Sequence, residues 1–196
     1  MEKLIERVKS ILLSPKDALT AVKSEEMTVV ETMKEYVAIL AAIPAAAQFI
    51  GFALVGLPIV GRYNFGRSLL FAIISYILSL VSVIVVGKVI NALAPSFKAV
   101  KNDSNAFKLA VYSLTPAFVA GIFNAIPSLS VLAFLGSLYG IYILYIGLPI
   151  LMDVPEEKAI AYTVVTLIVV MLVMIFVYFI AGAIAWGGGG GPGRMF

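Results

Sequence analysis

The residues of this sequence that could support acid–base chemistry are few and lie in one short segment. Asp153, Glu156 and Glu157 bracket a single turn, and two neighbouring carboxyl groups can act as a general acid and a general base. The helix dipole favours negative charge at a helix start, so the two glutamates are better explained as a first helical turn. The chain contains no Cys and no His, which removes the commonest nucleophile–base pairs and metal ligands. We therefore expect no enzyme, no metal and no cofactor.

The composition indicates a membrane protein. Of 196 residues, 62% are hydrophobic and only 13% are charged, and the mean hydropathy of +1.06 is far above that of a soluble domain. The formal net charge of +3 does not indicate nucleic-acid binding, because the basic residues lie beside apolar segments rather than in one patch. We expect a polytopic protein surrounded by the lipid bilayer, with no nucleic-acid partner.

Five apolar segments are long enough to cross a hydrocarbon layer of about 30 Å as α-helices. Residues 1–35 before them have the spacing of amphipathic helices, and residues 187–196 after them are expected to be a flexible Gly-rich tail. The predicted fold class is all-α, a bundle of five transmembrane helices with an amphipathic cytoplasmic amino-terminal segment. The predicted spans are 36–60, 69–93, 107–127, 129–151 and 160–186.

Two helix starts can be located within residues 1–35. Ser14 precedes a proline and is followed three residues later by Asp17, a spacing that predicts a capping box and a short helix to about Lys23. Thr28 and Glu31 repeat this spacing. A third helix is therefore expected to run from Thr28 directly into the first span.

The distribution of Lys and Arg predicts the orientation in the membrane. Five spans place the two termini on opposite sides, and basic residues are enriched on the cytoplasmic side. With a cytoplasmic amino terminus, eleven of the fourteen basic residues lie inside. The inner set is Lys3, Arg7, Lys9, Lys16, Lys23, Lys34, Lys88, Lys98, Lys101, Lys108 and Lys158, and the outer set is Arg62, Arg67 and Arg194.

The third and fourth spans form a predicted hairpin with an unusual pattern of small and aromatic residues. In the fourth span three glycines fall within about 40° on one helical face, and three tyrosines occupy the opposite half. Small residues allow helix backbones to approach closely in lipid. The glycine face is therefore a predicted contact surface, either for a helix of the same chain or for a second subunit of a homo-oligomer. These residues are Gly136, Gly140 and Gly147, and Tyr139, Tyr142 and Tyr145.

Pro116 lies deep in the third span. Proline has no backbone N–H, so it leaves the carbonyl four residues earlier, that of Tyr112, without its helical partner. Tyr112 and Pro116 should therefore mark one local distortion that a neighbouring helix fills.

These features together resemble the Yip-one domain family of integral membrane proteins. The resemblance rests on the pattern Tyr112-Ser113-Leu114-Thr115-Pro116 in the third span and on a run in the fourth span, Leu138-Tyr139-Gly140-Ile141-Tyr142-Ile143-Leu144-Tyr145-Ile146-Gly147-Leu148. It covers nearly the whole chain. Eukaryotic members of the family interact with prenylated Rab GTPases in vesicle transport between endoplasmic reticulum and Golgi, whereas prokaryotic members are mostly of unknown function.

Two departures from the family pattern bear on the expected partner. Val111 stands where the family's Gly-Tyr-x-x-x-Pro motif has its glycine, and the Asp-Leu-Tyr-Gly-Pro motif that precedes the spans in eukaryotic members is missing. Both put Rab binding in doubt. The resemblance then implies a prokaryotic member in the cell membrane.

Two functions are compatible with the sequence. The first is a non-enzymatic scaffold or adaptor that binds an unknown partner protein or organises the membrane; the second is a small transporter or channel for an unidentified solute. Polar residues in the spans more often hydrogen-bond between helices than line a path, and no inverted repeat is visible. We favour the scaffold. The polar candidates for a path are Gln48, Ser75, Ser79, Asn91, Thr115 and Asn124, with the three tyrosines of the fourth span.

Overall fold

The computed structural model describes residues 2–56 and 61–187, and within them it contains helices and turns but no strand. The prediction of an all-α protein is therefore confirmed. Residues 57–60, at the end of the first predicted span, and 188–196, in the predicted tail, lie outside the described residues. The α-helices are α1 (Glu2–Leu13), α2 (Pro15–Lys23), α3 (Val29–Thr32), α4 (Ala38–Ile50), α5 (Phe65–Leu93), α6 (Asp103–Ala120), α7 (Ser130–Met152) and α8 (Glu156–Gly187).

Four helical segments of the described chain are long and apolar enough to cross a membrane. The first joins α3 and α4 through a π-helical turn, Met33–Val37, and ends in a second, Gly51–Val55. The fifth predicted span, 160–186, lies within α8, and its crossing of the membrane stays a prediction. The four segments are Val29–Val55, Phe65–Phe97, Asp103–Ala125 and Pro127–Met152.

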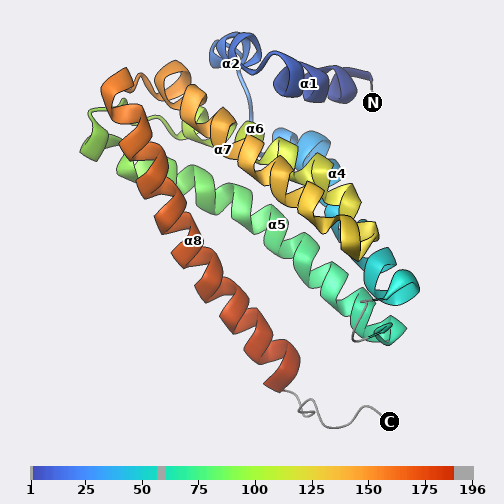
Figure 1. Cartoon of the computed structure of the whole chain (residues 1–196). Coiled ribbons are helices and arrows are strands. Elements are labelled where there is room, and N and C mark those ends of the chain that lie inside the picture. The colour runs from blue at the N-terminus through green and yellow to red at the C-terminus, as the bar shows by residue number, and fades with distance from the viewer. Residues whose placement is uncertain (1, 57–60, 188–196) are drawn as a thin grey trace.

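Helix α6 is the centre of the bundle, in contact with α4, α5 and α7 (Figure 1). Every side chain from 106 to 113 is buried. Small residues bring the neighbouring backbones close: a Cβ added to Gly87 of α5 would lie 3.3 Å from the Cα of Phe107. On the α4 side, a Cβ on Gly121 would lie 2.5 Å from the Cβ of Pro44. Helices in lipid associate through such close packing, because lipid is as apolar as the side chains.

Helices α1 and α2 lie against the flank of α6 and α7 (Figure 1). Ile11, Leu19 and Val22 have no exposed surface. The predicted helix after Ser14 is confirmed, since α2 begins at Pro15 and ends at Lys23, but the Ser14 side chain makes no capping hydrogen bond. The backbone N–H of Ser14 donates to Ser10 O at 2.9 Å, and with φ −139° and ψ 61° its backbone is not helical, so the chain breaks here between α1 and α2.

The predicted cap at Thr28 also differs in detail. Thr28 does precede α3, but its side chain caps no backbone N–H. Its hydroxyl instead donates to the carboxylate of Glu31. The two side chains of the motif therefore bond to each other rather than to the helix backbone.

One end of the bundle gathers segments that are far apart in the sequence. The Lys23 amine pairs with the Asp153 carboxylate at 2.6 Å, which joins α2 to the turn between α7 and α8. The N–H of Val100 donates to Met152 O at 2.9 Å, which joins the α5–α6 connection to the same turn. The amino-terminal helices, the α5–α6 connection and the α7–α8 turn therefore meet at this end.

Helix α8 is attached at its beginning. The Tyr162 hydroxyl donates to the carbonyl of Ile90 near the end of α5, and its ring stacks on Phe97 with centroids 4.5 Å apart. From there α8 runs diagonally away from α7 and across α5 (Figure 1).

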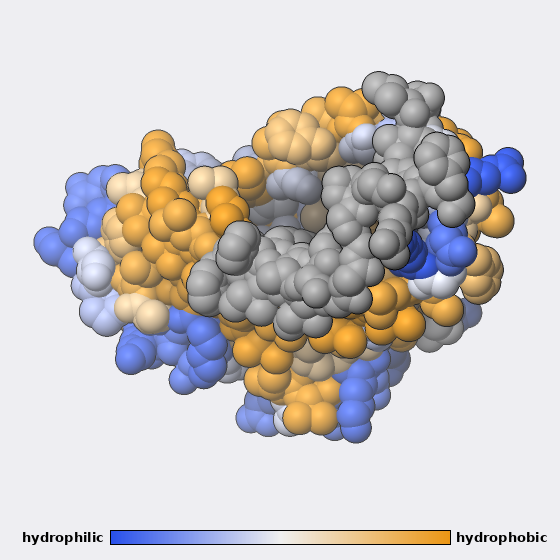
Figure 2. Space-filling model, turned by 90° about the horizontal axis from the view of Figure 1, so that it is seen from below, coloured by the Kyte–Doolittle hydropathy of each residue, from blue (hydrophilic) through white to orange (hydrophobic). Residues whose placement is uncertain are grey.

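The outer surface of the bundle is largely apolar. Seen from below, hydrophobic residues cover most of the described surface that is in view, and hydrophilic residues lie toward its edges (Figure 2). Large side chains on the outer faces of α5 and α7 are exposed, among them Phe71 and Phe134. Such an extended apolar surface is suited to lipid rather than water.

Candidate functional site

An open cleft of about 930 Å³ lies between α1, the connection from α2 to α3 and the start of the first span. Its lining combines charged side chains with aromatic and aliphatic ones. The charged residues are mostly exposed glutamates from three separate segments, which only the tertiary structure brings together. They are Glu2, Glu25, Glu26, Glu31 and Glu35, with the basic residues Lys3, Arg7 and Lys34.

Two buried tyrosines form the floor of the cleft. The rings of Tyr36 and Tyr112 meet edge to face with centroids 5.7 Å apart. The hydroxyls of Tyr36 and Thr115 are 3.0 Å apart, and Thr115 donates its single hydrogen to Val111 O. Tyr36 must therefore be the donor to Thr115. This chain of hydrogen bonds fixes the Tyr36 ring against α6.

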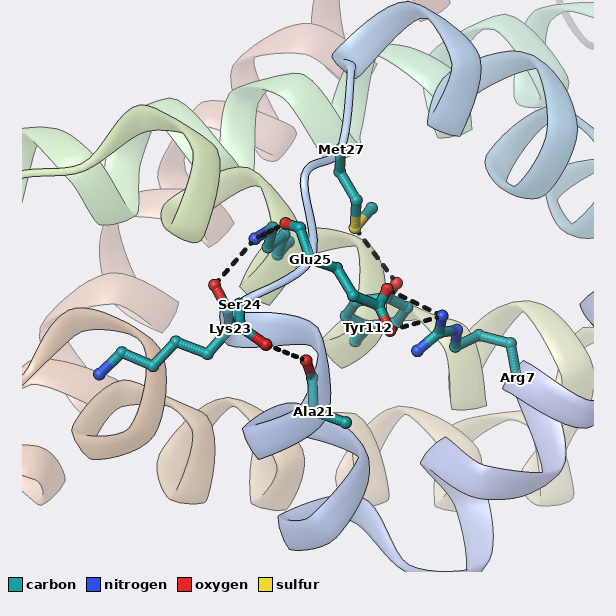
Figure 3. Close-up of polar contacts among 8 residues, drawn as sticks. Arg7, Ala21, Lys23, Ser24, Glu25, Met27 and Tyr112 are labelled. Carbon is teal, nitrogen blue, oxygen red and sulfur yellow. Dashed lines mark hydrogen bonds and ion pairs between the residues drawn. The ribbon is translucent and has the colours of Figure 1, made fainter.

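The connection between α2 and α3 is tied to α1 by an ion pair (Figure 3). The Nη2 of Arg7 donates to both carboxylate oxygens of Glu25, at 2.8 and 2.9 Å. Both side chains are partly exposed, at 31% and 38%. Two residues further along, the hydroxyl of Tyr112 contacts the sulfur of Met27 at 3.5 Å, which ties the same connection to α6.

Lys108 of α6 binds the backbone of this connection. Its side chain is only 2% exposed, and its amine donates to Glu25 O at 2.6 Å and to Lys23 O at 3.2 Å. It thereby satisfies a carbonyl at the end of α2, where a cation is also favoured by the helix dipole. From the sequence, Lys108 served only to mark the inner side of the membrane. The sequence signal that could have indicated its burial is its position between two apolar residues, Phe107 and Leu109.

The three glycines of the predicted stripe face α6. A Cβ on Gly140 would lie 2.3 Å from the carbonyl oxygen of Ser113, and one on Gly136 would lie 2.3 Å from a side-chain carbon of α6. On Gly147 it would lie 2.4 Å from Leu109 Cδ1. Real Cβ atoms do not approach this closely, so in this structure the stripe makes contacts within the chain.

The three tyrosines of α7 are divided in their roles. The Tyr139 hydroxyl donates to Leu12 O at the end of α1, at 2.8 Å, and its ring stacks on Tyr142 with centroids 5.7 Å apart. Tyr142 and Tyr145 are exposed. Pro116 is buried inside α6. Of the predicted site residues, only Tyr112 lines the cleft.

The acidic turn that was considered for acid–base chemistry pairs with Lys23 and begins α8. Asp153 adopts a left-handed conformation with φ 52° and pairs with Lys23. Glu156 and Glu157 are exposed in the first turn of α8, and among the described residues no cluster of potential metal ligands occurs. Lys88, on α5, pairs with Asp103 at 3.0 Å, and both side chains are 70% exposed.

Comparison with known proteins agrees with this architecture. Residues 9–191 match the Yip1 domain. The chain is 26% identical over 188 residues to the inner membrane protein YohC of Escherichia coli strain K12, which covers 89% of this chain and 93% of the relative. YohC of E. coli O6:H1 matches to the same extent, and no solved structure matches. Because the match covers nearly all of the chain, this integral membrane protein belongs to the Yip1 domain family.

Proposed function

We propose that this protein is a non-enzymatic adaptor of the cell membrane that binds a partner protein through the cleft at the cytoplasmic end of a five-span bundle. The observation that carries the proposal is the cleft itself, about 930 Å³ and lined by charged side chains over a fixed aromatic floor. Its position at the start of the first span makes it reachable from the aqueous side. It includes Tyr112, a residue of the family pattern.

The proposed topology has α8 as the fifth span and the amino terminus in the cytoplasm. It is supported by the meeting of the amino-terminal helices, the α5–α6 connection and the α7–α8 turn at one end of the bundle. Seven of the fourteen basic residues lie in these segments, and four more, Lys34, Lys88, Lys108 and Lys158, lie on the helices that adjoin them. Such residues concentrate on the cytoplasmic side.

The topology predicts opposite sides for the two termini. A thiol introduced near residue 1 should react with an impermeant reagent only after the cell membrane is opened, and one near residue 196 should react in intact cells. The native chain has no cysteine, so each variant carries a single reactive thiol. Equal labelling of both positions in intact cells would rule out the five-span arrangement.

The partner can be tested by photo-crosslinking in living cells. A photoreactive amino acid at Glu35, which lines the cleft, should yield an adduct with a specific protein. The matched control is Glu6, which is also an exposed glutamate near this end but does not line the cleft. A protein adduct at Glu35 and none at Glu6 supports the proposal. Identical adducts at both positions, or none at Glu35, would contradict it.

A transporter or channel is the alternative, and one observation favours it. Gln48 Oε1, Asn91 Oδ1 and Thr166 Oγ1 are buried without a hydrogen-bond partner, and a polar path needs such groups. They lie on three different helices, α4, α5 and α8. Solute flux into liposomes that contain the purified protein, lost on Gln48→Leu, would favour transport over the adaptor.

A further inference from the structure

Most carboxylates of the cleft have no basic partner among the residues that the structure describes. The described part of the chain contains three ion pairs, and of these only Arg7–Glu25 lies in the cleft. Glu26 and Glu35 are exposed and take part in none of the three. The lining has five acidic and three basic residues, so its charge is complementary to a cationic occupant.

Arg7 shows how the cleft holds a guanidinium group. It projects from an amphipathic helix and places one nitrogen against both oxygens of Glu25 (Figure 3). Charge-assisted hydrogen bonds of this kind are stronger than neutral ones. The chain's own arginine therefore occupies one wall of the cleft in the manner expected of a basic side chain from another protein.

The cleft also has an apolar side. Leu4, Met27 and Ile39 line it together with the two tyrosines of its floor, and Ile39 is 40% exposed near the start of the first span. An occupant that uses the whole cleft must present basic and apolar side chains together. A small inorganic cation would satisfy only the carboxylates.

We propose that the cleft takes an amphipathic segment of a partner protein whose Lys or Arg side chains pair with Glu26 and Glu35 while its apolar side chains contact Leu4 and Ile39. This inference deepens the proposed function and rests on it, because it names the chemistry of the partner at the same site. The headgroup of an aminophospholipid is the competing occupant.

The test uses the full-length protein in phosphatidylcholine nanodiscs. The probe is a fluorescein-labelled amphipathic helical peptide with four arginines and a leucine face, and its control carries four glutamates instead. We expect the arginine peptide to bind and the glutamate peptide not to bind. Glu26→Gln combined with Glu35→Gln should weaken arginine-peptide binding about fivefold, because exposed ion pairs are individually weak. Binding should also weaken at higher salt.

The matched control removes the same charge outside the cleft. Glu156→Gln combined with Glu157→Gln changes two exposed carboxylates at the same end of the bundle and should leave peptide affinity within about twofold. Equal weakening by both double variants would show attraction to the general negative field and would overturn the proposal, as would equal binding of the two peptides. Loss of peptide binding in phosphatidylethanolamine nanodiscs, restored in phosphatidylcholine, would assign the cleft to a lipid headgroup instead.

A second variant tests whether Arg7 acts as an internal competitor. Arg7→Gln frees the Glu25 carboxylate, so peptide affinity should rise, by about twofold to threefold. Unchanged or weaker binding would contradict the competitor role.

The peptide assay and the crosslinking assay test different claims. A Glu35 adduct without arginine-peptide selectivity would reject only the cationic segment, whereas peptide selectivity without any cellular adduct would reject the adaptor function.

Discussion

Two surfaces of the same helix, α6, are packed in different ways. Toward α7, the contact is made by glycines of α7 that pack so closely against Ser113 and Leu109 of α6 that no space remains for a side chain. Toward the amino-terminal segment, α6 makes polar contacts through Lys108 and Tyr112, next to an open cleft. The first contact depends on shape complementarity, and the second consists of polar bonds that other polar partners can replace.

This difference indicates which part of the molecule can move. A close backbone contact has no substitute, because neither lipid nor water fills the same volume. A partly exposed ion pair can be replaced by water or by a partner at little cost. We therefore expect α4, α5, α6 and α7 to behave as a rigid bundle and the connection from α2 to α3, which is held by polar contacts, to be the adjustable part.

The largest effect is expected where the packing is tightest. Gly140→Leu would introduce a branched side chain 2.3 Å from the Ser113 carbonyl oxygen, and overpacking of this kind costs about 1–3 kcal/mol. The yield of monodisperse protein and its thermal stability in detergent should fall sharply. Ile141→Leu, one position along and about 100° around the helix, should be tolerated.

The same pair of variants separates packing within the chain from packing between chains. A well-folded Gly140→Leu protein that has lost only self-association would place the stripe on a subunit interface. If Gly140→Leu and Ile141→Leu have equal yield, stability and oligomeric state, the close contact has no role in folding.

An effect of similar size, but confined to the connection from α2 to α3, is expected at Lys108. Lys108→Met keeps the length of the side chain but leaves the Lys23 and Glu25 carbonyls without their donor, which costs about 1–3 kcal/mol. Proteolysis and hydrogen exchange should increase between residues 23 and 28 while the bundle stays protected. Lys101→Met, at an exposed position, is the control. Equal protection in both variants would show that Lys108 does not hold the connection.

The smallest effect is expected at the ion pair that ties α1 to the connection. A double-mutant cycle with Arg7→Gln and Glu25→Gln should give a coupling energy of about 0.2–1 kcal/mol, because both side chains are partly exposed. The coupling should shrink as salt is raised. A coupling energy larger than the destabilisation caused by Lys108→Met, or one that does not change with salt, would contradict the view that this side of α6 is the adjustable one.

The sequence predicted the class of protein and its family, and both were confirmed by the helical architecture and the match over residues 9–191. It also placed three glycines on one face of a helix, although it left open what that face contacts. The helix starts after Ser14 and Thr28 were predicted correctly, but neither side chain caps a backbone N–H, because cap spacing indicates where a helix begins and not which partner the side chain bonds. The five-span count and the membrane orientation stay predictions.

What the sequence by itself determined is what depends on local periodicity and length. Apolar runs that can cross a bilayer must be helical, since lipid offers the backbone no hydrogen-bond partner. Only the tertiary structure decided that Lys108 would meet the carbonyl of Glu25, 83 positions away, and that Arg7, Glu35 and Tyr112 would line one cleft. Those contacts depend on where separate helices dock, and docking is set by side-chain shapes on two surfaces at once, which no single stretch of sequence contains.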